Sequence, residues 1–259
     1  MAALTGTVPD APDPTRAPAH ATTRAPGRAG PGPAPATVVD LSVSSVRALN
    51  QALHAPGAAA RWRVLEPRGA HNVACGIGQE MTVDIEGHAG YYCAGMNQRA
   101  SVTVHGNAGV GVAENMMSGT VRVRGSASQS AGATAHGGLL VVEGDAAARC
   151  GISMKGVDIV VGGSVGHMSA FMGQAGRLVV CGDAGDGLGD SLYEARIYVK
   201  GTVRSLGADC VEKPVRDEHL LELAELLKAA GLDEDPAAFR RYGSARELYH
   251  FRVDNAGAY

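Results

Sequence analysis

Apolar residues recur along the chain in short runs that alternate with variable residues and end at a glycine. The runs are MTVDIEG, SVTVHG, TVRVRG, LLVVEG, DIVVGG, RLVVCG and RIYVKG, and they end at Gly87, Gly106, Gly125, Gly144, Gly163, Gly182 and Gly201. All six intervals between these repeat glycines are 19 residues. Alternation with a period of two is typical of a strand with one buried face. The pattern therefore predicts one strand in every repeat.

Two columns of the repeat are apolar in every copy. The position two before the repeat glycine holds Ile85, Val104, Val123, Val142, Val161, Val180 and Val199, and the position four before it holds Val83, Val102, Val121, Leu140, Ile159, Leu178 and Ile197. Small residues recur two and seven positions after the glycine, where a coil turns sharply. Because every coil returns after the same length, we expect the strands to stack in parallel. The sequence predicts an all-β fold, a right-handed parallel β-solenoid of about seven 19-residue coils over residues 68–213.

The segments that flank the repeats predict small helical caps at both ends, because the open ends of a solenoid would otherwise invite aggregation. Residues 37–67 form the N-terminal cap. There we expect a strand at 37–41, a short helix N-capped by Ser44 or Ser45 that ends near Pro56, and an extended piece at 62–65.

Residues 214–259 form the predicted C-terminal cap and tail. An amphipathic helix begins at Asp217 and is stopped by Gly231. A second helical piece is expected from Pro236 toward Leu248, and a strand at 249–253.

Residues 1–36 differ in composition, since they hold eight of the twelve prolines and are otherwise mostly Ala, Gly, Thr and Arg. Such a segment cannot bury enough apolar surface to offset its ordering entropy, and we expect a disordered tail. A targeting peptide is the alternative, which the density of proline disfavours.

Bulk composition excludes several function classes. A net charge of −3 gives no reason to expect nucleic acid as a partner, and no apolar run is long enough for a membrane span. The five cysteines contain no CxxC pair, which favours a reducing, cytoplasmic setting.

Three candidate sites are legible, and each has a structural interpretation. The GxGxG run at 185–189 suggests a dinucleotide loop or a calcium roll, but it lies inside a coil without room for the helix that a dinucleotide loop requires. Cys93 and Cys150 share a column yet lie three coils apart, so they are expected to be small core residues. The outward column Glu86, His105, Arg124 and Glu143 could form an acid–base cluster, although alternating charges on a solvated ladder fit it better. We therefore assign this chain no catalytic, cofactor-binding or metal-binding residue.

Methionine is the more informative residue type. Met96, Met116, Met117, Met154, Met168 and Met172 all lie between the predicted strands. Methionine fills irregular cores and is also favoured on adaptable contact surfaces. We expect most of them to be core residues and some to form an interaction surface.

Several phrases then resemble a known family. These are the coils themselves, Glu114–Val121 (ENMMSGTV), Gly189–Tyr193 (GDSLY), Ser205–Asp209 (SLGAD) and the ending DNAGAY. Over residues 37–259 the chain resembles the GXGXG domain, the C-terminal β-helix of the glutamate synthase large subunit. It is most similar to stand-alone versions, the glxC-type proteins and the small GXGXG subunit of N-methylglutamate synthase.

The resemblance implies a scaffold subunit of an oxidoreductase in nitrogen metabolism and glutamate biosynthesis. In that family a class II glutamine amidotransferase releases ammonia, an FMN and iron–sulfur synthase part performs the reductive step, and the β-helix holds them in place. The implied partners are these two subunits, which would carry the cofactors. Two alternatives stay open: a scaffold subunit of a formylmethanofuran dehydrogenase or formyltransferase/hydrolase complex, and an independent carbohydrate-active β-helix enzyme.

Overall fold

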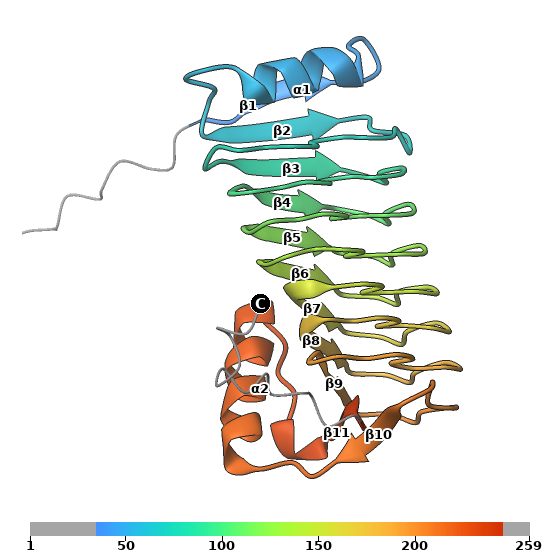
Figure 1. Ribbon diagram of the computed structural model, residues 1–259. Helices are drawn as coiled ribbons and strands as arrows, with labels where there is room; N and C mark the ends of the chain where they lie inside the picture. Colours follow the sequence, from blue (N-terminus) through green and yellow to red (C-terminus); the bar gives the residue numbers. More distant parts are fainter. Residues whose placement is uncertain (1–34, 246–259) are drawn as a thin grey trace, which may run out of the picture. The chain divides into compact units, whose positions relative to one another are not determined.

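The computed structural model describes residues 35–245, which contain all of the repeats (Figure 1). Most of the predicted tail at 1–36 and the predicted strand at 249–253 lie outside the described residues. None of the helices between residues 35 and 245 is long and apolar enough to cross a membrane.

Within residues 35–245, eleven strands form one sheet. They are β1 (Thr37–Asp40), β2 (Arg61–Leu65), β3 (Thr82–Glu86), β4 (Ser101–Val104), β5 (Thr120–Val123), β6 (Leu139–Val142), β7 (Lys155–Val161), β8 (Ala175–Val180), β9 (Arg196–Val199), β10 (Cys210–Lys213) and β11 (Arg240–Ser244). From β1 to β9 every strand pairs in parallel with the next. The predicted parallel β-solenoid of about seven coils is confirmed.

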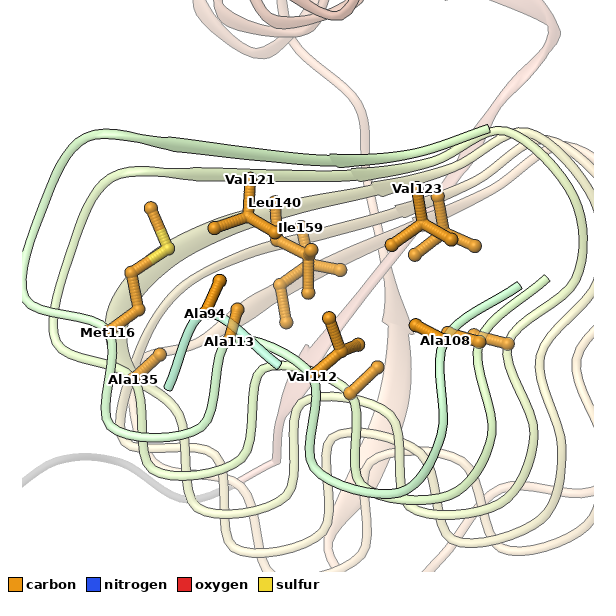
Figure 2. Packing of buried hydrophobic residues seen from close by; sticks show 14 of the residues in the cluster. Ala94, Ala108, Val112, Ala113, Met116, Val121, Val123, Ala135, Leu140 and Ile159 are labelled. Atoms are coloured by element: carbon orange, nitrogen blue, oxygen red, sulfur yellow. The ribbon is translucent and has the colours of Figure 1, made fainter. Parts of the chain in front are cut away.

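The interior of the solenoid is filled by the columns that the repeat predicts. Val121, Leu140 and Ile159 are register partners on successive strands and are fully buried, as Figure 2 shows. The column two after the repeat glycine forms a second line of parallel bridges, which runs from Ala89 through Ala108 to Val203. Each buried Val, Leu or Ile side chain contributes about 1.5–3 kcal/mol relative to an exposed one, and these columns therefore hold the coils together.

The first helix, α1 (Val46–His54), covers the first coil. The Ser45 hydroxyl accepts a hydrogen bond from the Ala48 N–H at 3.1 Å, which confirms the predicted N-cap. Leu49 and Leu53 are buried against the core. On the polar side of α1, the Asn50 amide accepts from the Ala74 N–H at 3.0 Å, so the helix is fixed to the first loop.

The second helix, α2 (Asp217–Ala230), ends at Gly231, which is left-handed at φ 70° as the predicted stop requires. It lies along the outer face of the sheet beside β6 to β9, rather than across the open end (Figure 1). There Leu223, Leu226, Leu227 and Ala230 pack on an outward row made of Val141, Val160, Val179 and Tyr198. At its C-terminal end, Arg122 donates to the Ala230 carbonyl at 2.8 Å.

The predicted second helix after Pro236 is wrong. Residues Pro236–Ala238 form a single 3-10 turn (η1), and β11 follows at once. Strand β11 pairs antiparallel with β9 on one side and with β10 on the other. The free edge of β9 would otherwise present unpaired N–H and C=O groups, and pairing there outweighs the local helical pattern. The end of the sheet is thus closed by two antiparallel strands.

Candidate interaction surface

After each of the first six repeat glycines the coil turns through a loop in which every second residue has a left-handed backbone. The residues five, seven and nine after the repeat glycine all adopt φ between 52° and 71°: Tyr92, Ala94 and Met96; Gly111, Ala113 and Asn115; Ser130, Gly132 and Thr134; Arg149, Gly151 and Ser153; Met168, Ala170 and Met172; Gly187, Gly189 and Ser191. A left-handed residue other than glycine costs roughly 1–2 kcal/mol, so this backbone must be held by its neighbours.

Hydrogen bonds between coils hold it. In one loop, Gly111 donates to the Gln129 carbonyl of the next coil, Ala113 donates back to Cys93, and Asn115 donates forward to Ala133, each at 2.9 Å. The preceding loop has the same alternation, since Tyr92 donates forward to Val110, Ala94 back to Val73 and Met96 forward to Glu114. Every loop is therefore bonded to both neighbouring loops, and the stacked loops form a rigid edge.

Side chains on this edge point alternately in and out. The residues seven after the first six repeat glycines are buried, and a Cβ at Gly132 would lie 2.6 Å from the Ile159 Cδ1 atom. Residues at positions four, five, nine and eleven face outward in most coils. We call this outward surface, together with the loop after β9, the loop edge.

The loop edge carries exposed apolar side chains in two groups. The first group lies in the first two repeats and consists of Tyr91, Tyr92, Met96 and Met117. The second group lies at the other end and consists of Met172, Tyr193 and Leu206. Between them the same positions are polar: Ser130, Thr134, His136, Arg149 and Ser153. Met96 is 54% exposed and Met172 44%, and exposed Met and aromatic residues are enriched where proteins bind one another.

The structure thus divides the methionines into two sets. Met116 and Met154 are fully buried, and Met96, Met117 and Met172 are exposed. Met168 is half-buried, so the expectation that most of the six are core residues is wrong, and a role of the exposed ones in an interaction surface stays a prediction. The tyrosines of the loop edge were missed, although Tyr91, Tyr92 and Tyr193 stand at positions that are mostly polar or small in the other coils.

The predicted acid–base column does not converge on one site. Glu86 accepts from Arg63 at 2.7 Å, and His105 bonds with Asp84 at 2.9 Å. Farther along, Glu143 accepts from both Arg122 and Arg124, at 2.8 and 2.6 Å. These side chains form separate, partly exposed ion pairs. Within residues 35–245, no three His, Cys, Asp or Glu side chains gather as a metal site would require.

The remaining candidate residues have structural places. All five cysteines are free thiols. Burial raises the pKa of the Cys93 thiol far above its ordinary value, and that of Cys150 to about 12, so both are inert core residues. Gly187 and Gly189 of the GxGxG run are left-handed loop residues, and no helix follows them in the coil.

Comparison with known proteins gives one close relative and no matching family model. The chain is 61% identical over 226 residues to Protein GlxC of Rhizobium meliloti (strain 1021). The alignment covers 86% of this chain and 99% of that protein. Identity at this level over nearly the whole relative extends across the solenoid and beyond it, and the chain belongs to the family of Protein GlxC.

Proposed function

We propose that the chain is a non-catalytic scaffold subunit of a glutamate synthase-like or N-methylglutamate synthase-like oxidoreductase. In this proposal it docks a class II glutamine amidotransferase subunit and an FMN and iron–sulfur synthase subunit in the cytoplasm. The cofactors belong to the synthase subunit. Free thiols at all five cysteines fit a reducing compartment.

The observation that carries the proposal is the loop edge. Its backbone is fixed on both sides by the loop-to-loop hydrogen bonds, so a partner would bind it without a large ordering cost. Two apolar groups separated by polar coils suit two partners docked side by side. The phrases that resemble the GXGXG domain also contribute left-handed loop residues, namely Asn115, Gly189, Ser191 and Asp209.

The solenoid interior supports a scaffold more than an enzyme. Its columns are packed by Val, Ile, Leu and small residues with almost no exposure. The polar side chains described above on the outer face of the first strands are engaged in ion pairs. Catalysis needs a nucleophile or an acid–base pair held free in a cleft, and a docking role needs only a shaped, rigid surface.

The test is purification of the tagged full-length chain from its native host under gentle conditions. We expect two proteins to co-elute, one with glutaminase activity and one with a flavin absorbance spectrum. Substituting Met96→Glu with Met117→Glu should release one of them, and Met172→Glu should release the other. Leu221→Glu is the matched control, because Leu221 is 68% exposed but lies on α2, away from the loop edge.

Three outcomes contradict the proposal. The chain could elute alone, it could co-elute with proteins that lack both signatures, or the loop-edge variants could retain both partners as Leu221→Glu does.

A further inference from the structure

A polar cavity of about 720 Å³ opens beside the first turn of α2, where the helix meets β9, β10 and β11. Its lining includes Arg196, Lys213, Arg216, His219, Glu222 and Arg241. Cations therefore enter it from three strands and from the residue that caps the helix. It lies on the outer face of the sheet, and its residues play no part in the docking surface proposed above.

Two of these cations are placed directly opposite one another. Lys213 on β10 and Arg241 on β11 are antiparallel register partners, and Arg241 is in turn opposite Tyr198 on β9. Register partners point to the same face, so both charges lie on the face that carries α2. Like charges in this arrangement destabilise a sheet. Their persistence therefore calls for a counter-charge.

The described part of the chain does not supply that counter-charge. Within residues 35–245 neither Lys213 nor Arg241 has a carboxylate within 4.0 Å. The Arg241 Nε atom is buried without a hydrogen-bond partner there, and the guanidinium donates only a long bond, at 3.4 Å, to the Pro214 carbonyl. An anion in the cavity would pair with the Lys213 ammonium and with the guanidinium of Arg241, since both residues line it.

The two carboxylates of the cavity are already engaged. Glu222 accepts from Arg196 and from the Tyr198 hydroxyl, and it lies 3.8 Å from Arg177 as well. Glu218 lies 3.6 Å from Arg216 at the exposed rim. The cavity lining thus has two carboxylates and four cations, namely Arg196, Lys213, Arg216 and Arg241, so two positive charges are uncompensated.

His219 adds a neutral donor. The Arg216 N–H donates to the His219 Nδ1 atom at 3.1 Å, which places the ring proton on Nε2. Burial of the ring, and then the charge of Arg241, lower the pKa of His219. The Nε2 atom lies 3.8 Å from the Glu218 carboxylate, which is too far for a hydrogen bond, so its N–H can be offered to an anion in the cavity.

We propose that this cavity binds a small oxyanion, with Lys213 and Arg241 as its principal ligands and the first turn of α2 facing it. A phosphate group and a carboxylate share the chemistry that these donors recognise. The proposal does not depend on the scaffold function.

Titration calorimetry on the full-length chain at constant ionic strength tests it, with inorganic phosphate and malonate as separate probes. We expect at least one probe to bind with a submillimolar Kd, and the preferred probe identifies the chemical group. Lys213→Gln should weaken that binding about tenfold or more, which is the loss of one charged hydrogen bond. Arg241→Gln should abolish it.

The control is Lys155→Gln, which removes the same charge from an exposed position on β7 and should leave the Kd unchanged. Absence of binding by either probe at about 10 mM overturns the proposal. Equal affinity of Lys213→Gln and Lys155→Gln also overturns it, because the anion would then bind elsewhere. If Arg241→Gln fails to fold, the Lys213→Gln comparison decides alone.

Discussion

Two glycines with the same backbone conformation should respond differently to alanine. Gly132 and Gly187 have φ of 67° and 68°. A Cβ at Gly132 points into the core, 2.6 Å from Ile159 Cδ1 and 3.1 Å from Leu140 Cδ2. A Cβ at Gly187 meets only the end of the half-buried Met168 side chain, at 2.9 Å from Sδ. The pair therefore separates backbone strain from packing.

The magnitudes follow from these surroundings. A left-handed alanine costs about 1–2 kcal/mol, and the stiffer unfolded chain returns about 0.4–1 kcal/mol. Gly187→Ala should thus lower the free energy of unfolding by about 1 kcal/mol. Gly132→Ala carries the same cost and adds about 1–3 kcal/mol for overpacking, so we expect about 2–4 kcal/mol in total.

A second substitution tests the assigned contact. Ile159→Val removes the Cδ1 atom that lies nearest the added Cβ. It should therefore lower the free energy of unfolding less in the Gly132→Ala variant than in the wild-type chain.

Urea unfolding measures these differences. The fluorescence of Trp62, the single tryptophan, reports the first coils, and circular dichroism reports the sheet. Equal destabilisation by Gly132→Ala and Gly187→Ala would refute the packing argument. If the double variant loses the sum of the unfolding free energies that Gly132→Ala and Ile159→Val lose singly, the two side chains do not meet.

Three further outcomes are expected. Val160→Asp buries a charge under α2, so it should lower the free energy of unfolding by about 3 kcal/mol or more and speed hydrogen exchange in α2. Thr103→Asp is the control: it lies in the same column where no helix covers the sheet, and it should change the free energy of unfolding by about 0.5 kcal/mol or less. The fold lowers the pKa of His219. The neutral ring's contribution to the free energy of unfolding is therefore present above the pKa of the unfolded state, near 6.5, and is lost as the pH falls through the pKa of the folded state. Thermal unfolding of His219→Gln should depend less on pH than that of the wild-type chain. Cys93 and Cys150 should resist iodoacetamide in native buffer at pH 8 and react in urea, which mass spectrometry of the alkylated peptides would show.

Periodicity carries most of the fold, and it fails where pairing between distant segments decides. The sequence signals the position of α2 only at the outward row, three positions before each repeat glycine. This row holds polar residues at Asp84, Thr103 and Arg122 and becomes apolar from Val141 onward. That change marks where the helix covers the sheet. Strand β11 has no such signal, because its conformation depends on the free edge of β9.

The loop edge was only partly predictable. Its inward column is readable from small residues, since close packing admits nothing larger. The left-handed positions beside it are occupied by residues such as Met96, Arg149 and Ser153, which carry no preference for that backbone. The stack of neighbouring loops imposes it, and a sequence read one coil at a time cannot reveal a conformation that the next coil enforces.

The change of the outer row at Val141 also bears on how such a gene can lengthen. Duplicating one 19-residue unit among β3 to β5 would preserve the register of every later coil and the four apolar residues under α2. The chain would gain about 4.8 Å of separation between its two ends for each unit added. A duplication under α2 would instead move Arg122 away from the Ala230 carbonyl that it binds. We expect natural length variants of this family to differ on the N-terminal side of β6.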